Sequence, residues 1–278
     1  MTDPLPIVLL TDFGTSDTYV GQVKGVLTAR APGAPLIDLT HEVSPYAIDE
    51  GAWLLETALP FLPDPAVVLA VVDPGVGSER LPIAVRASAP GDSGFVRYFV
   101  GPDNGLLSAV APPDSRPSAP RSCPAPPGLD IRSIESPEAR LATVSATFHG
   151  RDLFAPAAAH IAVTGHHEVL GPTRDELTLL PPFAGRAEGT TTRGNVIHVD
   201  RYGNLVTTIR KEQLPPDFTL DINGHTIERI VRTFSDASPG ALACHVDSSS
   251  FLAIAEREGN AAARTGAARG DDVVLTPR

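Results

Sequence analysis

The chain has 278 residues, of which 42% are hydrophobic and 20% are charged. This length and composition predict a folded protein with a sizeable buried core, divided into about two domains. The formal net charge of -11 argues against the clustered positive charge with which proteins bind nucleic acids or anionic membranes, so we expect neither partner.

Two further features bear on location and metal binding. No stretch approaches the roughly 18 consecutive apolar residues of a membrane span, and the first residues, MTDPLPIVLLTD, lack the basic start of a signal peptide. These features predict a cytoplasmic protein. The two cysteines, Cys123 and Cys244, lie far apart and without the spacing of zinc ligands, so we expect neither a structural zinc site nor a disulfide framework.

Strand patterns and helical periods alternate through the first part of the chain. Residues 6–11 predict a strand, residues 19–30 predict a helix with its apolar side chains on one face, and residues 67–72 predict a second strand. Another strand-like run follows at residues 81–85. This alternation predicts an α/β domain with a largely parallel sheet.

The pattern changes in the second half of the chain. Residues 111–128 are rich in proline and almost lack large apolar side chains, which predicts an exposed loop insertion. Residues 151–165 predict a helix that ends at Gly165. Short strand patterns separated by turn signals follow. We therefore expect an N-terminal α/β domain at residues 1–170, a linker at 171–188, and a smaller β-rich, barrel-like domain at 189–278.

Polar residues gather at the ends of the predicted strands. Asp12 follows the first strand, Asp73 follows residues 67–72, Asn104 lies in a Pro-Asp-Asn turn, and His149 precedes a helix. Open α/β sheets carry their ligand sites at such strand ends. Each residue also has a purely structural interpretation, as a turn former or a loop histidine, but four together indicate a site.

The segment DPGVGSER, residues 73–80, raises the same choice in one turn. Pro74, Gly75 and Gly77 predict a tight turn after a buried strand. One interpretation is a capped turn whose Asp73 and Arg80 form a surface ion pair. The other is that the turn brings the two side chains together for chemistry.

Five segments carry a family resemblance, and they occur in the order TDFGTSDTYVGQVKG, VVDPGVGSER, VGPDNGLL, TFHGRDLFAP and VDRYGNLVTTI. With them the chain resembles the S-adenosyl-L-methionine (SAM) hydroxide adenosyltransferases, or SAM hydrolases, which are related to the SAM-dependent fluorinase and chlorinase. The resemblance implies cleavage of SAM by water to adenosine and L-methionine, with no metal or other cofactor. It also implies an α/β N-terminal domain, a β-rich C-terminal domain, and a homotrimer with active sites between neighbouring subunits.

The resemblance also assigns roles to individual residues. The trio to which the family's water activation is attributed matches Asp73, Arg80 and His149. The residues expected to bind the substrate are Asp12 for the ribose hydroxyls, Tyr46 beside the substrate, Asp200 for the methionine ammonium, Tyr202 and Phe234 around the adenine, Asn204 at the adenine edge, and Ser248 near the methionine carboxylate. Without the resemblance, residues 202–204 are a good turn and Phe234 is a good core residue.

The expected chemistry needs few groups. SAM is a sulfonium, so its ribose C5′ already carries a good neutral leaving group, and the protein must supply an aligned, partly desolvated water. An acid, a guanidinium and an imidazole around one water can orient it and accept its proton. The sequence leaves open whether Asp73 or His149 takes that proton, because an Asp73 paired with Arg80 is a poor base and the tautomer of His149 is unknown.

Departures from the family pattern limit the methionine contacts. Ser249 stands where the halogenases carry an arginine for the carboxylate, and Asp247 and Ser250 stand where many relatives have Asn and Gly. Thr208 likewise stands where Asn is frequent.

Two other functions stay open at this point. A halide-using SAM adenosyltransferase is disfavoured because those relatives lack an acid at the position of Asp73 and carry a halide-binding Ser where this chain has Gly150. A non-catalytic SAM or adenosine sensor would not need the complete trio. The His-His-Glu run at residues 166–168 lacks the ligand spacing of a metal-dependent hydrolase.

Overall fold

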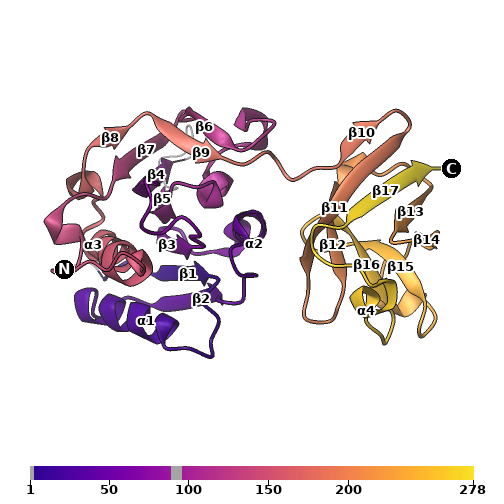
Figure 1. Cartoon of the computed structure of the whole chain (residues 1–278), viewed down its shortest axis with the longest axis horizontal. Helices are drawn as coiled ribbons and strands as arrows, with labels where there is room; N and C mark the ends of the chain where they lie inside the picture. Colours follow the sequence, from indigo (N-terminus) through magenta and orange to yellow (C-terminus); the bar gives the residue numbers. More distant parts are fainter. Residues whose placement is uncertain (1–2, 89–95) are drawn as a thin grey trace. The chain divides into compact units, whose positions relative to one another are not determined.

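The computed structural model describes residues 3–88 and 96–278. The chain forms two compact units, Met1–Pro182 and Phe183–Arg278 (Figure 1). Their boundary lies within the segment expected as a linker. Part of that segment belongs to the first unit, because it contains the short strands β8 (Thr173–Arg174) and β9 (Glu176–Leu179). These strands pair with β7 (Leu129–Ser133) and β6 (Arg121–Pro124), respectively.

The first unit is built on a seven-stranded sheet in the order β2-β1-β3-β5-β4-β7-β8. Its strands, besides β8, are β1 (Ile7–Thr11), β2 (Leu36–Thr40), β3 (Ala66–Val71), β4 (Pro82–Ser88), β5 (Val96–Pro102) and β7 (Leu129–Ser133). The pairings among β2, β1, β3 and β5 are parallel, whereas β4, β7 and β8 extend the sheet in antiparallel fashion. The α/β class with a largely parallel sheet is thus confirmed, with an antiparallel extension that the alternation of elements did not reveal.

Both faces of the parallel strands are covered, which explains their uninterrupted apolar sequences. On one face, Leu9 and Leu69 pack with residues of α1 (Tyr19–Arg30) and α3 (Ala155–Thr164). On the other face, Leu10 and Val68 pack with α2 (Ile48–Ala58) and the 3-10 segment Leu106–Val110. Alternate residues of one strand therefore enter two separate cores.

The helices begin and end close to the sequence predictions. The face of α1 that packs on the sheet carries Val20, Val23 and Leu27, which are all buried. A single π-helical turn, Gly150–Phe154, leads into α3, and Gly165 ends α3 in the left-handed conformation with φ of 69°. The remaining 3-10 segments of the first unit are Leu59–Phe61, Pro113–Ser115, Pro137–Ala139 and Glu168–Leu170.

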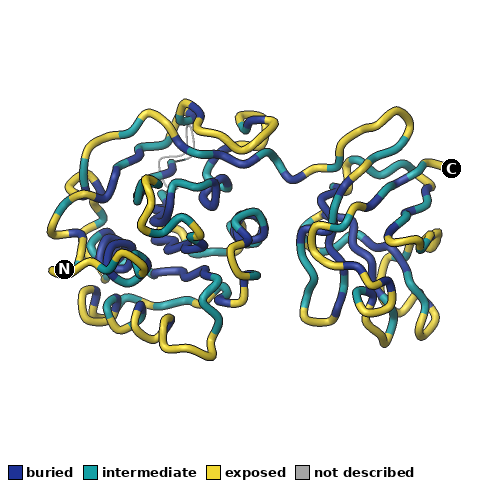
Figure 2. Tube along the Cα trace, in the orientation of Figure 1, coloured by how far each residue is buried: buried dark blue, intermediate teal, exposed yellow. Residues whose placement is uncertain are grey.

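The proline-rich segment 111–128 is more structured than expected. Its strand β6 (Arg121–Pro124) pairs with β9 in a separate two-stranded sheet, and Cys123 is buried. Much of the segment is nevertheless exposed (Figure 2). A proline is tolerated here because both strands of a two-stranded sheet are edge strands. The N–H groups on the outer side of each strand are not needed for pairing.

The second unit is an antiparallel, nearly closed barrel-like sheet in the order β14-β13-β17-β11-β12-β16-β15, with β10 paired to β11. The expected β-rich C-terminal region is thus confirmed. Its elements are β10 (Arg186–Glu188), β11 (Thr191–Val199), β12 (Leu205–Arg210), β13 (Phe218–Ile222), β14 (His225–Ile227), β15 (Leu242–Val246), β16 (Phe251–Glu256), α4 (Ala261–Thr265) and β17 (Asp272–Pro277), with 3-10 segments Lys211–Gln213 and Phe234–Asp236.

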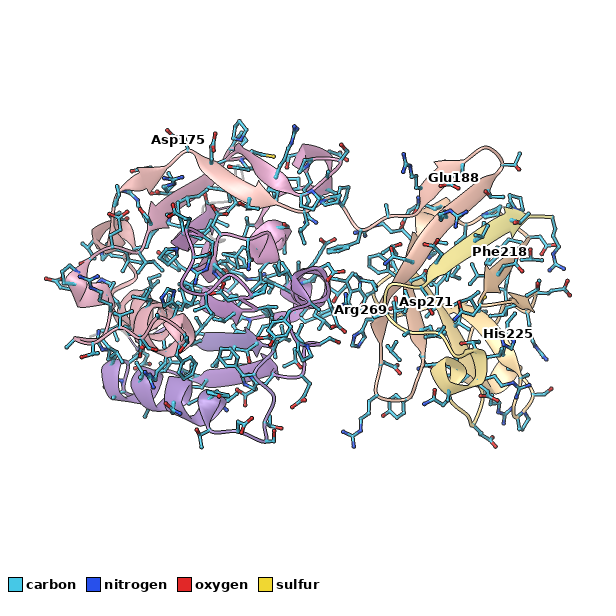
Figure 3. The ribbon with its side chains drawn as sticks, viewed as in Figure 1. Asp175, Glu188, Phe218, His225, Arg269 and Asp271 are labelled. Atoms are coloured by element: carbon cyan, nitrogen blue, oxygen red, sulfur yellow. The ribbon has the colours of Figure 1, made fainter. Side chains whose placement is uncertain are left out.

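Two features of this unit bear on its closure and its core. An isolated bridge between Ile230 and Cys244 links the chain after β14 to β15, which are the two outer strands of the sheet. Phe218, at the start of the β13–β14 hairpin, is almost fully buried, and His225 begins the second strand of that hairpin (Figure 3).

Among the described residues, no helix is long and apolar enough to cross a membrane.

Candidate active site

A pocket of about 530 Å³ lies in the first unit beside the carboxyl ends of β1 and β3. Its wall comes from the loops that follow these strands, from the segment before α2, and from the segment that leads into α3. The lining residues are Asp12, Phe13, Tyr19, Pro45, Tyr46, Val71, Asp73, Val76, Ser145, Thr147, Phe148, His149, Gly150 and Arg151. The pocket thus occupies the position where open α/β sheets place their ligands.

Asp73 and Arg80 form a buried, two-pronged ion pair beside this pocket. Arg80 Nε donates to Asp73 Oδ1 at 2.8 Å, and Nη2 donates to the other carboxylate oxygen. The side chains of Arg80 and Asp73 are only 9% and 6% exposed, which contradicts the interpretation as a surface ion pair. The turn between them is tight, because Val76 N donates to Asp73 O, and Gly77 has φ of 78°.

His149 completes the trio through the same guanidinium. It lies just before the π-helical turn, and its Nδ1 is 2.9 Å from Arg80 Nη2. Since a guanidinium can only donate, Nδ1 accepts, and the ring carries its hydrogen on Nε2. Burial lowers the pKa of His149, and the charge of Arg80 lowers it further, against weaker opposing effects of Asp73 and Asp152. The imidazole is therefore held neutral.

The third nitrogen of the Arg80 guanidinium, Nη1, has a different environment from the other two. Its carbon lies 5.2 Å from the centre of the Phe154 ring, so the aromatic face covers one side of the cation. Within the described residues, Nη1 is buried without a hydrogen-bond partner. Two of the three guanidinium nitrogens, Nε and Nη2, thus make all the side-chain contacts of Arg80 to Asp73 and His149.

Asp12, which follows the neighbouring strand β1, also lines the pocket and is held by a backbone amide. Tyr46 N donates to Asp12 Oδ2 at 2.9 Å. Tyr46 itself has φ of 68°, and its side chain is exposed. Burial raises the pKa of Asp12, although the hydrogen bonds from Tyr46 N and its own backbone N–H lower it, and the nearby charge of Asp73 raises it further. Asp12 and Tyr46, which are both predicted substrate-binding residues, line the pocket.

Three aromatic rings of the pocket wall were not predicted. Phe13, Tyr19 and Phe148 contact one another edge to face, with ring centres 5.4 to 6.2 Å apart. Phe13 and Phe148 are the immediate neighbours of Asp12 and His149 in the sequence, so adjacency to a polar site residue is the signal that could have found them.

A second ion pair, also not predicted, secures the loop before His149. Asp152 is fully buried and accepts from Arg151 Nε at 2.6 Å and from Ser145 N at 2.8 Å. Burial alone would raise the pKa of Asp152, but these bonds outweigh it and the pKa is lowered. Arg151 also donates to Gln22 of α1 at 2.8 Å. These bonds fix the part of the pocket wall that carries Ser145 and His149.

The other predicted binding residues belong to the second unit. Asp200 caps its own turn, because its carboxylate accepts from Tyr202 N, Asn204 N and Asn204 Nδ2 at 2.7 to 2.9 Å. Tyr202 is 76% exposed, and Ser248 is also exposed.

One of these predicted residues, Phe234, packs beside His245. Phe234 packs against the His245 ring with centres 4.8 Å apart. Burial lowers the pKa of His245, while the nearby charges of Asp247 and Asp200 oppose that effect. Of the predicted binding residues, Phe234 thus contacts His245. His245 itself was not among the predicted site residues.

Metal binding has no support in the part of the chain described here. Within residues 3–88 and 96–278, no group of three or more histidine, cysteine or acidic side chains is arranged to hold a metal ion. The pocket itself offers the carboxylates of Asp12 and Asp73 and the neutral imidazole of His149, with the Arg80 guanidinium bonded to the last two.

Comparisons with known proteins show which family has this combination of an α/β unit and a barrel-like unit. The profile of the SAM hydroxide adenosyltransferase N-terminal domain matches residues 7–171, and that of the C-terminal domain matches residues 194–274. The chain belongs to the SAM hydroxide adenosyltransferase family.

Individual relatives extend over nearly the whole chain. The chain is 38% identical to the (R)-S-adenosyl-L-methionine hydrolase of Thermus thermophilus, across 97% of this chain and 99% of that protein. It is 24% identical to a fluorinase of Actinoplanes sp., across 90% of each chain. A crystal structure of an uncharacterized conserved protein from Thermotoga maritima superposes with a TM-score of 0.83 and 32% identity, across 97% of this chain and 99% of that one.

Proposed function

We propose that this protein hydrolyses SAM to adenosine and L-methionine. The observation that carries the proposal is the hydrogen-bonded trio of Asp73, Arg80 and His149, in which the Asp73–Arg80 pair is buried and Asp73 and His149 line a pocket together with Asp12. The relatives named (R)-S-adenosyl-L-methionine hydrolase, at 37% to 39% identity, support the same reaction.

In the proposed reaction, the oxygen of water attacks the ribose C5′ of SAM. The new C5′–O bond forms as the C5′–S bond breaks, and its electron pair stays on sulfur, so that methionine leaves as a neutral thioether. One proton is released, which balances the loss of the sulfonium charge. The protein must align the water opposite the leaving sulfur and receive this proton.

The geometry favours Asp73 over His149 as the group that receives the proton. The Nδ1 lone pair of His149 already accepts from Arg80, so only its Nε2–H faces other groups, and that atom is a donor. Each oxygen of Asp73 accepts one bond from Arg80 and keeps a further lone pair. We assign His149 to hold the water oxygen, Asp73 to take its proton, and Arg80 to fix both side chains.

The substrate fits the charge of the pocket. SAM is a sulfonium cation, and Asp12 supplies a carboxylate that can accept both ribose hydroxyls, with Tyr46 beside it. Asp200, Tyr202, Asn204, Phe234 and Ser248 of the second unit complete the proposed contacts to the methionine and adenine ends. The reaction needs no metal or other cofactor, since sulfonium is already a good leaving group.

We infer further that the active protein is a homotrimer in which a neighbouring subunit supplies the second-unit residues. Activity per subunit should then fall on dilution below the assembly constant. A monomer that light scattering detects and that has full activity would contradict the shared site.

A cytoplasmic location is supported by the two free, buried cysteines, which suit a reducing compartment.

The test of the function is incubation of purified, chelator-treated protein with SAM in three buffers, one with fluoride, one with chloride and one without halide. Chromatography then identifies the products. Adenosine and methionine in equal amounts in every buffer are the expected result. A 5′-haloadenosine would instead indicate a halide-using adenosyltransferase, which the negative charge of Asp73 disfavours. Binding of SAM without any product would indicate a sensor. Loss of activity on chelation, restored by a metal, would contradict a metal-independent reaction.

A further inference from the structure

One buried histidine near the pocket has no role in the proposed chemistry. His41 follows β2, and its side chain is only 4% exposed. Its Nδ1 lies 2.8 Å from the hydroxyl of Thr11, the last residue of β1. Thr11 is itself 2% exposed, and neither residue lines the pocket.

The partners of the His41 ring define its orientation. Nε2 lies 3.1 Å from Asp38 Oδ1, and because a carboxylate can only accept, Nε2 carries hydrogen. Asp38 is held in turn by Lys24 of α1 at 2.6 Å. In the tautomer with hydrogen on Nε2, Nδ1 accepts and the Thr11 hydroxyl donates to it.

Thr11 and His41 together enclose a short piece of the pocket wall. The Thr11 hydroxyl accepts from Phe13 N at 3.3 Å, and the His41 carbonyl accepts from Gly14 N at 2.7 Å. Asp12 and Phe13, which both line the pocket, lie between these fixed points. When the Thr11 hydroxyl donates its hydrogen to His41, the lone pairs of the hydroxyl oxygen are left to accept from Phe13 N. The His41 ring thereby favours the hydrogen bond from Phe13 N to Thr11.

We propose that Thr11 and His41 are a positioning pair that sets the orientation of Asp12 for the ribose hydroxyls of the substrate. The inference rests on the proposed function for the identity of the substrate, and it adds residues that do not touch the substrate. The competing interpretation is an ordinary core histidine whose hydrogen bonds only stabilise the fold. The two differ in whether substrate binding depends on the Thr11 hydroxyl through Asp12.

The first experiment compares Thr11→Val with a matched control. Thr207 in the second unit is also buried, and its hydroxyl likewise accepts from the N–H two residues ahead, at 3.2 Å, while donating to Leu252 O. Both Thr11→Val and Thr207→Val remove one buried hydroxyl and should lower the melting temperature. Only Thr11→Val should raise the KM for SAM, by about 3- to 10-fold, with kcat changed less. Thr11→Ser, which keeps the hydroxyl, should restore the KM.

A double-mutant cycle tests the path through Asp12. If Thr11 acts by positioning Asp12, Thr11→Val should have no further effect on KM in an Asp12→Ala background, because interacting residues are not additive. His41→Leu should raise KM to a similar extent as Thr11→Val, and the pair of substitutions should do no more than either alone. Independent, multiplicative effects of Thr11→Val and Asp12→Ala would overturn the inference.

A measurement without substrate separates this inference from the proposed function. The Tyr46 amide donates to Asp12, so its hydrogen exchange reports where the Asp12 carboxylate lies. Thr11→Val should speed exchange at Tyr46 at least about threefold, as loss of one hydrogen bond permits, and Thr207→Val should not. Unchanged Tyr46 exchange in Thr11→Val would refute the positioning pair even in a protein that hydrolyses SAM. If the wild-type protein does not hydrolyse SAM, the proposed function fails, and this exchange comparison still decides the positioning pair.

Discussion

At the scale of single residues, the proposed chemistry depends on Asp73 and Arg80 acting together. Their side chains form a buried fork at the pocket, so removal of either partner leaves the other misplaced and its charge uncompensated. We expect Asp73→Asn, Arg80→Ala and the double variant each to lose turnover by a similar factor, about 10²- to 10⁴-fold, since residues that act as a unit are strongly non-additive. Steady-state kinetics with SAM measures this.

Binding measurements on the same variants separate chemistry from folding. SAM affinity should change little for Asp73→Asn, because this residue is proposed to contact the water and not the substrate. A purely structural ion pair predicts another outcome, with turnover near normal and a change visible only in thermal melts. Normal turnover in Asp73→Asn would rule out the proposed role of the trio.

The proposed role of Asp12 predicts a change in affinity and a pH effect. Asp12→Ala should weaken SAM binding by about 1.5 to 3 kcal/mol, the range for loss of a charged hydrogen-bond partner, as measured by calorimetry. Only the ionised carboxylate accepts from both ribose hydroxyls. Burial raises the pKa of Asp12 above 3.8, so this carboxylate takes up a proton at a higher pH than an ordinary aspartate does. The wild-type KM should therefore begin to rise, as the pH falls, at a pH where an ordinary aspartate is still ionised. An unchanged affinity of Asp12→Ala would exclude ribose binding by this residue.

At the scale of elements, the turn between β3 and β4 must keep its shape for Asp73 to meet Arg80. Gly77 in this turn has φ of 78°, and a Cβ there would lie 2.6 Å from the Ala146 carbonyl oxygen. Gly77→Ala should therefore cost more than the roughly 1 to 3 kcal/mol of a left-handed residue alone, and it should lower turnover. Kinetics and thermal melts of this variant measure both effects.

Gly33 offers a matched control for this prediction. It has φ of 88°, and nothing lies within 4 Å of an added Cβ, so Gly33→Ala brings the backbone strain without the contact. It should lower stability and leave turnover unchanged. Equal turnover in the Gly77→Ala and Gly33→Ala variants would contradict a link between this turn and catalysis.

The elements differ in how well the sequence predicts them. The first strand, the helix α1 and the strand β3 follow from continuous or periodic apolar patterns, because burial decides those positions directly. The strand β6 was missed because its prolines suggest a loop, whereas its pairing with β9 depends on a segment some 50 positions away in the sequence. The antiparallel placement of β7 beside β4 likewise depends on non-local pairing, since Val85 of β4 pairs with Ile131 of β7.

The site shows the same division. Asp12, Asp73 and His149 could be selected because each is a polar residue at a strand end or before a helix. The role of the His41 ring could not be predicted, because what marks it is its contact with Thr11, 30 positions away in the sequence. The protonated nitrogen of His149 was also beyond the sequence, since it depends on the contact with Arg80 across 69 positions.

At the scale of the whole molecule, histidines that are partly or fully buried predict how stability depends on pH. Burial lowers the pKa of His149, His160, His167 and His245 below the ordinary 6.5. The unfolded chain then binds more protons than the folded one just below pH 6.5, so the free energy of unfolding is highest above that pH and falls as the solution is acidified. Each histidine contributes at most about 1.4 kcal/mol per pH unit.

His167 allows this prediction to be tested in the first unit alone. It is fully buried against Tyr98, and Trp53, the single tryptophan of the chain, reports the unfolding of that unit by fluorescence. Urea unfolding at pH 7.5 and 5.5 should show a smaller difference for His167→Phe than for the wild type. An equal or larger difference would mean that His167 does not contribute to the acid sensitivity.

The central claim is that water, activated at the Asp73–Arg80–His149 trio, attacks the ribose C5′ of SAM, and isotopic labelling tests it most directly. The measurement is mass spectrometry of the products formed from SAM in water enriched in ¹⁸O. Adenosine with one heavy oxygen at its 5′ position, unlabelled methionine, and almost no product from Asp73→Asn are the predicted results. Unlabelled adenosine, label in methionine, or undiminished labelled adenosine from Asp73→Asn would contradict the claim.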